Sequence, residues 1–306
     1  MNQSTHSPVC VVGSLNTDLV VKTDQLPAPG QTVLGGDFFM SPGGKGGNQA
    51  VAAARLGASV TMVARLGSDI FADAAMASLA RDGVDCTHVG RDDARPSGVA
   101  LISVDASGEN QIVVAPGANG SLGPVDVERA CRTLPAETLV LLQLEIPMET
   151  VERAVAVTAA RGCRVILDPA PAPAGALPRA LLAGTYLVTP NETEAERLTG
   201  VTVTDEASAR TAAEALLDAG ANRVALTLGA AGVCLADRAG QRFIQAPTVQ
   251  AIDTTAAGDC FNGALAAGLG RGLELDASVA FGCRAAAVSV TRLGAQDAMP
   301  TAAEID

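Results

Sequence analysis

One stretch of the sequence, Gln250 to Gly263, places three small residues directly before a carboxylate. Ala256, Ala257 and Gly258 lead into Asp259. The apolar residues that follow recur every four positions, which predicts one face of a helix, at Phe261, Leu265 and Leu269. Backbone N–H groups at a helix start have no partner within the helix, and the helix dipole is positive there. Small side chains let a phosphate approach these groups, so the turn predicts an anion site.

Asp259 adds a reactive group to this site. A carboxylate repels a bound phosphate unless a cation or a proton transfer is involved. Phosphoryl transfer needs such a carboxylate as a base, beside donors that hold the transferring group. A capped helix in which Asp259 only favours the helix dipole would explain the same residues without any chemistry. The stretch alone leaves both interpretations open.

Polar side chains also follow the first predicted strand. Val9 to Gly13 is a short apolar run, typical of a buried parallel strand, and Asn16 and Asp18 come just after it. In open α/β sheets, ligands bind at the carboxyl ends of the strands. An Asx-type turn would explain one of these two residues more readily than both.

A second candidate ligand-binding segment is the glycine-rich stretch Ser41 to Ala50. Its glycines surround Lys45, which supplies a positive charge, and Asn48 supplies an amide. The spacing differs from that of a P-loop. A flexible connection into the helix predicted over Val51 to Leu56 is the alternative interpretation.

Strands and helices alternate regularly from Gly123 onward. Helices are predicted at Pro124 to Thr133, Met148 to Arg161, Asp205 to Ala219, from Asp259, and at about Asp276 to Val290. Short apolar strands are predicted in this region at Leu139 to Leu144, Val165 to Leu167, Tyr186 to Thr189 and Val224 to Leu228, with short β stretches continuing to Val249. Before this region, a strand is predicted at Val60 to Leu66. This alternation predicts an α/β fold of three layers, with a mostly parallel sheet between two layers of helices, over residues 1–306 as a single domain.

Two of these strands end in further polar residues. Glu145 follows Leu139 to Leu144, and Asn191 follows Tyr186 to Thr189. The pattern from Asn191 to Glu194 is also that of a capping box at a helix start, and a capping role and a ligand role can coexist.

Two segments without helical periodicity interrupt the alternation, at about residues 16–42 and 97–118. Both have β-type patterns with glycine, proline or hairpin-like turns. They predict a small β-sheet inserted at two points, which would serve as a lid that excludes water from the site.

Composition narrows the possible partners. With 21 basic and 33 acidic residues the net charge is −12, which argues against nucleic acid as a partner. The seven cysteines form no Cys-x-x-Cys pair, and there are two histidines, so a zinc site or a disulfide framework is not expected. Met1 to Pro8 has no apolar core of signal-peptide length, and no apolar run is long enough to cross a membrane. We therefore expect a cytoplasmic protein without a membrane partner.

Taken together, these motifs resemble the ribokinase-like carbohydrate kinase family. The similarity covers Val9 to Gln296. Gly43 to Ala50 is similar to the N-terminal signature of the family, and Asp253 to Asp259 to its C-terminal signature, which is highly specific. The flanking motifs, at residues 13–18, 143–145, 189–196 and 291–296, are most similar to the family members that phosphorylate ribose.

The resemblance implies a role for each matching position. Asp259 would be the base for a primary hydroxyl of the sugar, and the N–H groups of Ala256, Ala257 and Gly258 would form the anion hole. The sugar would be bound by Asn16, Thr17, Asp18, Gly44, Lys45, Gly46, Gly47, Asn48 and Glu145. ATP would be bound by Asn191, Thr227, Leu228, Gly229, Ala230, Ala231, Gly232 and position 283, next to Gly258 and Asp259. Glu194 would help to place Mg²⁺.

Family members are also activated by a monovalent cation, typically K⁺. The matching positions are Asp253, Thr255, Ser289, Arg292, Gly294 and Ala298, several of them through backbone carbonyls. Two positions depart from the pattern. Ala298 lacks the hydroxyl of the usual serine, which predicts altered cation activation. Cys283 replaces the usual histidine or asparagine beside the adenine, which predicts altered nucleotide binding.

The expected activity is therefore transfer of the γ-phosphate of Mg·ATP to the 5-hydroxyl of D-ribose, which gives D-ribose 5-phosphate. A kinase for deoxyribose, fructose, pseudouridine or a similar small sugar or nucleoside is the alternative within the same class. A sugar-binding regulator without catalysis is the alternative from another class. Because family members often pair their lids between subunits, a homodimer is expected.

Overall fold

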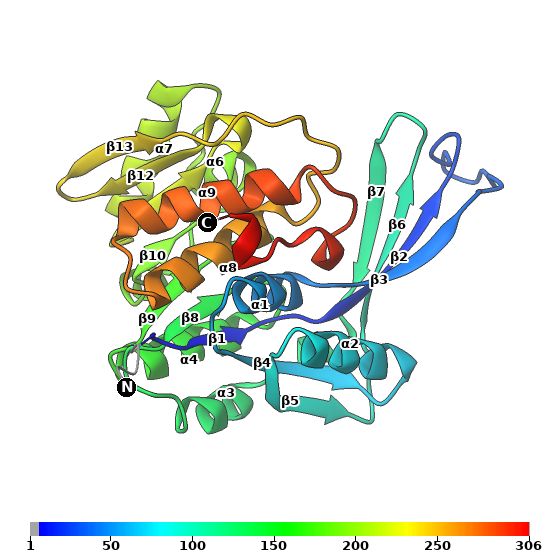
Figure 1. Cartoon of the computed structure of the whole chain (residues 1–306), viewed down its shortest axis with the longest axis horizontal. Helices are drawn as coiled ribbons and strands as arrows, with labels where there is room; N and C mark the ends of the chain where they lie inside the picture. The colour runs from blue at the N-terminus through cyan, green and yellow to red at the C-terminus, as the bar shows by residue number, and fades with distance from the viewer. Residues whose placement is uncertain (1–5, 306) are drawn as a thin grey trace.

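The computed structural model describes residues 6–305, and within them nine strands form one main sheet (Figure 1). The first five residues of the polar segment Met1 to Pro8 lie outside the described part of the chain. Along the sheet the strands are β13 (Gly240–Ile244), β12 (Val233–Asp237), β11 (Arg223–Thr227), β10 (Leu187–Val188), β9 (Arg164–Leu167), β8 (Leu139–Leu142), β1 (Val9–Val12), β4 (Val60–Gly67) and β5 (Asp85–Asp92). From β11 to β5 all neighbours are parallel, and only β12 and β13 add antiparallel pairs.

Helices cover both faces of this sheet. One face packs against α1 (Lys45–Arg55), α2 (Ile70–Arg81), α8 (Ala257–Gly270) and α9 (Leu275–Ser289). The other packs against α3 (Pro124–Cys131), α4 (Met148–Ala159), α5 (Arg179–Ala183), α6 (Glu192–Thr199) and α7 (Glu206–Ala219). Alternate residues of β1 enter the two cores, since Val9 and Val11 belong to one and Cys10 and Val12 to the other. The predicted three-layer α/β fold is confirmed.

A second sheet of four strands stands beside the main one, at the right of Figure 1. Its strands, in order, are β3 (Phe38–Gly43), β2 (Asn16–Lys22), β6 (Gly98–Val104) and β7 (Asn110–Ala115). β2 pairs in parallel with β6, so two segments far apart in the sequence form the centre of this sheet. Its strands belong to the two segments that the sequence predicts to be inserted.

The structure differs from the sequence predictions mainly where packing overrides local preference. α1 begins at Lys45, although its glycines favour a loop. A Cβ at Gly46 would lie 2.7 Å from the backbone N and O of Ser14, so only glycine lets this helix start lie so close to the turn after β1. α2 and β5 were not predicted, and the β stretches expected up to Val249 end with β13.

The segment before α8 is not a strand either. No strand is present at Gln250 to Ile252, which lead toward α8. Instead, the backbone N–H groups of Ile252 and Asp253 donate to the carbonyl of Val290, at 2.7 and 3.2 Å. The end of α9 therefore fixes the entry to α8.

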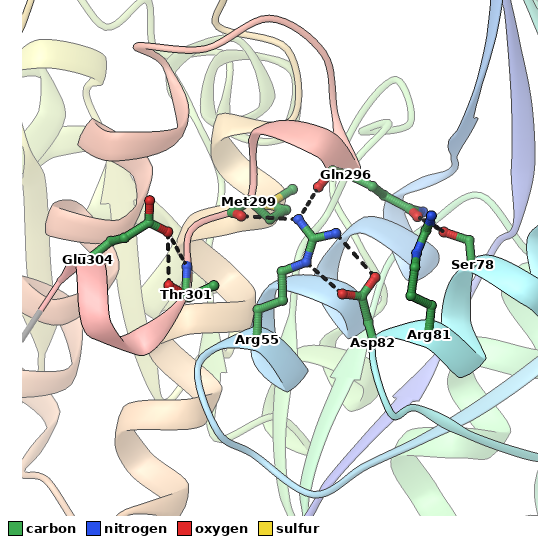
Figure 2. A network of polar contacts seen from close by, with 8 residues as sticks. All are labelled: Arg55, Ser78, Arg81, Asp82, Gln296, Met299, Thr301 and Glu304. Carbon is green, nitrogen blue, oxygen red and sulfur yellow. Dashed lines mark hydrogen bonds and ion pairs between the residues drawn. The ribbon is translucent and has the colours of Figure 1, made fainter.

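Arg55, at the end of α1, fixes the C-terminal segment to the main domain (Figure 2). Its guanidinium group donates to both carboxylate oxygens of Asp82, at 2.7 and 3.2 Å. It also donates to the carbonyls of Gln296 and Met299, at 2.6 and 3.1 Å. Because the Arg55 side chain is only 19% exposed, this charge-assisted set is shielded from solvent and holds the 296–299 segment against α1.

Substitution of Gly263 by alanine should test the contact between α1 and α8. A Cβ at Gly263 would lie 2.6 Å from Ala52 Cβ and 2.7 Å from the Gln49 carbonyl. We expect the Gly263→Ala variant to lose about 1–3 kcal/mol of unfolding free energy in urea, because the two helices must move apart. As a control, Gly90→Ala lies on an exposed edge, where the added Cβ meets nothing closer than 3.9 Å. Equal stability of the two variants would contradict the close packing.

Candidate active site

A cavity of about 280 Å³ lies between the carboxyl ends of the main-sheet strands and the second sheet. Ala100, Ile102, Ile112 and Val114 of the second sheet form its apolar side. The predicted site residues that line it are Asn16, Asp18, Gly44, Lys45, Asn48, Glu145, Asn191, Glu194, Thr227, Thr255, Ala256, Ala257, Gly258 and Asp259. Predicted residues from six separate segments thus meet at one place, as expected for the carboxyl edge of an open α/β sheet.

Asp259 is the most buried carboxylate of this cavity that the sequence singles out. It lies in the first turn of α8 and is 5% exposed. Its Oδ2 accepts a hydrogen bond from Asn48 Nδ2 at 2.9 Å, and its Oδ1 accepts one from Gln49 Nε2 at 3.0 Å. Burial raises the pKa of Asp259, while Lys45 and the two amides oppose the rise. A base with a raised pKa and a fixed orientation is suited to proton transfer near neutral pH.

Gln49 links Asp259 to a second buried carboxylate. Its Nε2 also donates to Asp168 Oδ2 at 2.8 Å, and its Oε1 accepts from Gln143 Nε2 at 2.7 Å. All four side chains are 5% exposed or less. Burial raises the pKa of Asp168 well above its ordinary value, although Lys45 opposes the rise. One amide therefore orients two carboxylates of the cavity.

The turn before Asp259 has the form of an anion-binding helix start. Ala256 is the N-cap residue of α8, with a left-handed backbone at φ 57°. A Cβ built on Gly258 would meet no atom within 4 Å, so the turn is open for close approach by a ligand. Asn262 Nδ2 donates to the Gly258 carbonyl at 3.0 Å, and Thr189 Oγ1 donates to Asn262 Oδ1 at 2.8 Å. These two side chains fix the turn to the end of β10.

Two polar residues of β2 face the cavity from the second sheet. Asn16 Oδ1 accepts from Asn119 Nδ2 at 2.8 Å, and Asn119 is itself fixed by hydrogen bonds to both backbone groups of Leu15. The amide group of Asn16 is thereby oriented. Burial raises the pKa of Asp18 to about 6, and the charges of Glu145 and Asp259 add to the effect.

Lys45 balances the acidic charge of the cavity from the start of α1. Burial alone would lower its pKa, but the carboxylates of Asp259, Asp168, Glu145 and Glu194 raise it, so the ammonium group stays charged. Glu145 is held nearby, because its Oε2 accepts from Ser14 Oγ at 2.5 Å and from the Lys45 backbone N at 3.1 Å.

The far end of the cavity carries the residues predicted to bind a nucleotide. Asn191 is the N-cap of α6, and the predicted capping box is present, with Asn191 N donating to Glu194 Oε2 at 2.9 Å and Glu194 N donating to Asn191 Oδ1 at 2.8 Å. Thr227 ends β11 beside it and forms an isolated bridge with Asn191. Burial raises the pKa of Glu194, and Lys45 opposes the rise.

Several other predicted residues do not line the cavity. Thr17 points to the opposite face of β2, while Gly46 and Gly47 pack against the segment Ser14 to Leu15. The turn after Thr227 comprises Leu228, Gly229, Ala230, Ala231 and Gly232, and its 3₁₀ part is exposed. Cys283 is 5% exposed within the apolar core, and burial raises the pKa of its thiol to about 11.

Of the residues predicted to bind a monovalent cation, Asp253, Thr255 and Gly294 are in contact beside the α8 turn. Asp253 accepts from Thr255 N at 2.9 Å, from Thr255 Oγ1 at 2.6 Å and from Gly294 N at 2.9 Å. Ser289 donates to the Ala286 carbonyl at 2.9 Å, Arg292 pairs with Glu304, and Ala298 is 1% exposed. Asp253 thus joins the two segments on which these positions lie.

Three polar residues that organise the site, Asp168, Gln49 and Asn119, were not singled out from the sequence. Asp168 follows Val165 to Leu167 directly, the same pattern that singled out Glu145, and could have been found in this way. Gln49 lies next to Asn48, but its contacts with Asp168 depend on the helical geometry of α1. Asn119 acts through tertiary contacts that no sequence spacing reveals.

Comparison with known proteins agrees with this geometry. A model of the pfkB family of carbohydrate kinases matches residues 7–302. The chain belongs to the pfkB family of carbohydrate kinases. The resemblance inferred from the motifs is thereby confirmed, and the chain is an enzyme of the phosphotransferase class.

Relatives within the pfkB family are similar over nearly the whole chain. The chain is 43% identical over 294 residues to a ribokinase of Haemophilus influenzae, which covers 96% of this chain and 95% of that protein. It is 38% identical over 293 residues to a deoxyribokinase of Salmonella typhi, with 96% and 95% covered. Among solved structures, an Arabidopsis thaliana ribokinase complexed with ribose and ATP has a TM-score of 0.89 and 30% identity, with 98% and 97% covered. A Thermotoga maritima ribokinase has a TM-score of 0.87 and 36% identity, with 98% of each chain covered.

Removal of the Gln49 amide should destabilise the protein in a pH-dependent way. We expect Gln49→Leu to lower the free energy of unfolding by about 2–4 kcal/mol near pH 7, because two buried carboxylates lose a donor. The pKa of Asp259 and of Asp168 is already raised, and loss of the amide raises both further. As the pH falls, protonation removes the buried charges, so the deficit should shrink toward pH 5.

The measurement is urea unfolding at both pH values. Gln111→Leu, on the exposed edge strand β7, is the matched control and should have little effect at either pH. A deficit for Gln49→Leu that stays the same at both pH values would contradict the proposed link to the two carboxylates.

Proposed function

We propose that the protein is an ATP-dependent kinase that phosphorylates D-ribose at its 5-hydroxyl. The observation that carries this proposal is the position of Asp259, a buried carboxylate held by two amides next to an open helix start. This arrangement supplies a base and an anion site within one turn of helix. Deoxyribokinase is also a relative, but identity to a ribokinase is higher, at 43% against 38%, and we assign ribose as the substrate.

The reaction follows from the positions of these groups. Asp259 takes the proton of the 5-hydroxyl, and the sugar oxygen forms a bond to the γ-phosphorus of ATP. The bond from that phosphorus to the bridging oxygen breaks in line, and ADP leaves. Donors at Ala256, Ala257 and Gly258 stabilise the charge of the transferring group, and Lys45 adds a positive charge beside it.

Ribose recognition falls to the polar residues at the second-sheet side of the cavity. Asn16 and Asp18 offer an amide and a carboxylate, and Glu145 and Lys45 lie across from them. Each carboxylate or amide can contact two neighbouring hydroxyls of a small sugar. The second sheet, residues 16–42 and 97–118, acts as the lid, and its residues Ala100, Ile102, Ile112 and Val114 exclude water over the sugar.

ATP occupies the end of the cavity formed by Asn191 and Thr227, next to the exposed turn at residues 228–232. Mg²⁺ typically binds through one or two carboxylates, waters and the substrate phosphates. Glu194 and Asp168 both line the cavity and fit this mode, and no preformed cluster of three or more metal-binding side chains exists among the described residues. When bound, Mg²⁺ would neutralise charge on the phosphates.

A monovalent cation, K⁺, is proposed behind the anion turn. Asp253 fits such a role, because its contacts with Thr255 and Gly294 already hold the two candidate segments together. Backbone carbonyls of residues 289–298 would complete the set. Ala298 offers no side-chain oxygen, so we propose that cation activation is weaker than in relatives with a hydroxyl there.

The lid also suggests a homodimer. Met40, Leu19, Leu101 and Val113 are cross-strand neighbours in one row on the face of the second sheet away from the cavity. Three of them are more than half exposed, with Met40 at 57%, Leu101 at 51% and Val113 at 66%. An exposed apolar row of this kind typically marks a contact surface.

All seven cysteines are free, as expected in a reducing compartment, and we propose that the enzyme acts in the cytoplasm. None of the helices in the described part is long and apolar enough to cross a membrane.

Replacement of Asp259 by asparagine tests the proposed function most simply. We expect Asp259→Asn to lower kcat for ribose by about 10²-fold or more, because the base is lost while the shape is kept. A coupled assay of ADP formation measures this. Asp73→Asn, a surface carboxylate that is 79% exposed, is the control and should keep normal turnover. Near-normal turnover of the Asp259→Asn variant would contradict the assignment of Asp259 as the catalytic base.

Ribose binding should weaken at acidic pH through Asp18. The pKa of Asp18 is about 6, above the ordinary value, so the carboxylate is ionised at neutral pH and protonated as the pH falls through 6. If the ionised form accepts the sugar hydroxyls, the dissociation constant of ribose without ATP should rise about tenfold between pH 7 and pH 5. Calorimetric titration provides the measurement. Asp18→Asn should bind ribose with a smaller pH dependence, and an equal dependence would contradict the role of Asp18.

The dimer is tested by light scattering. We expect the wild-type protein to have the mass of two chains, and Leu101→Lys to shift it toward one chain, because a charge enters the apolar row. Thr211→Lys, an exposed position of α7 on the main domain, is the control and should keep the mass of two chains. A wild-type monomer at micromolar concentration would overturn the proposal.

A further inference from the structure

A second cavity, of about 430 Å³, lies at the end of the main sheet opposite the active site. Three of its residues stand at the starts of adjacent parallel strands: Arg164 begins β9, Tyr186 directly precedes β10, and Arg223 begins β11. The turn between α8 and α9, residues 270–275, forms the opposite wall. In Figure 1 this region lies at the left, far from the second sheet.

Two arginines share the ring of Tyr186. The guanidinium carbon of Arg223 lies 4.6 Å from the ring centroid, and that of Arg164 lies 5.6 Å from it. Both distances are within the range of cation–π contacts, which orient a guanidinium group without using its N–H donors. The ring therefore holds two positive charges close together, with donors left for another partner.

Two of the three acidic residues that line this cavity, Asp237 and Asp276, are engaged by Arg242. Arg242 binds Asp276 through two of its nitrogens and lies 3.6 Å from Asp237. Glu274, the remaining carboxylate of the lining, is exposed at the rim. Within residues 6–305, neither Arg164 nor Arg223 is paired with a carboxylate, and Arg164 has only a long contact of 3.5 Å to the Leu269 carbonyl.

We propose that this cavity binds a small oxyanion, of the phosphate or carboxylate type, between Arg164 and Arg223. Guanidinium groups bind such anions through paired N–H donors, and the ring of Tyr186 fixes their planes in advance. The net charge of the chain is −12, so its overall field repels anions. Two guanidinium groups without a carboxylate partner supply a local positive charge that offsets this repulsion. Ser7 is a further polar residue of the lining.

This site is separate from the active site. The α8 helix connects the two, since it begins at the anion turn and its last residues, Leu269 and Gly270, line the second cavity. Its 14 residues span about 21 Å. Ligands at the two ends can therefore be distinguished by a probe that is present at one end only.

The sequence supplies such a probe, because Tyr186 is the only tyrosine and there is no tryptophan. Intrinsic tyrosine fluorescence of the full chain thus reports on the second cavity. We expect titration with inorganic phosphate to change this fluorescence saturably in the millimolar range or below, while sodium chloride of equal ionic strength does not. A parallel titration with citrate distinguishes a phosphate ligand from a carboxylate ligand.

Variants assign the response to the two arginines. The double variant Arg164→Gln/Arg223→Gln should weaken phosphate or citrate binding at least tenfold, and Arg129→Gln, an exposed residue of α3, should leave it unchanged. If the double variant does not fold, Arg223→Lys keeps the charge but loses the paired donors, and should weaken binding severalfold. No saturable change in the wild type, a change that sodium chloride reproduces, or equal binding by the arginine variants would overturn the proposal.

Discussion

The structure of the active site depends on one buried carboxylate that two helices hold between them. Asp259 belongs to the first turn of α8, and both amides that bind it, Asn48 and Gln49, belong to the first turn and a half of α1. The two helix starts must therefore meet in a fixed register. Glycine at position 263 permits this, because a larger side chain would collide with α1. Packing of the core and orientation of the Asp259 carboxylate are consequences of the same contact.

The cavity contains more carboxylates than positively charged groups, and the proposed phosphoryl transfer would bring further negative charge into it. The carboxylates that line it are Asp18, Glu145, Asp168, Glu194 and Asp259. Burial raises the pKa of Asp18, Asp168 and Glu194, and repulsion by the neighbouring carboxylates adds to the effect. A bound phosphate is compatible with this charge only if positive groups offset it. In the proposed mechanism, Lys45, the starts of α1 and α8, and a metal ion carried with ATP would provide that offset, so the kinase would need no basic surface.

Much of the fold and of the site could be predicted from the sequence, for physical reasons that differ by residue. Apolar runs and helical periodicity can be recognised within short stretches of sequence. They therefore predicted the alternating strands and helices of the three-layer architecture. Asp259 and Asn191 carried local signals of helix starts. Gln49 and Asn119 could not be assigned, since their roles are hydrogen bonds across 210 and 103 residues of chain. The start of α1 at Lys45 was missed because tertiary packing, not propensity, makes that glycine-rich segment helical.

The most direct test of the central claim is an assay of ADP formation with a panel of sugars and nucleosides, followed by phosphorus NMR of the product. Our account predicts that D-ribose has the highest kcat/KM and that the product is a phosphomonoester at the 5-hydroxyl. A higher kcat/KM for deoxyribose, fructose or pseudouridine would contradict the substrate assignment. Sugar binding without any ADP formation would contradict the assignment of Asp259 as a catalytic base.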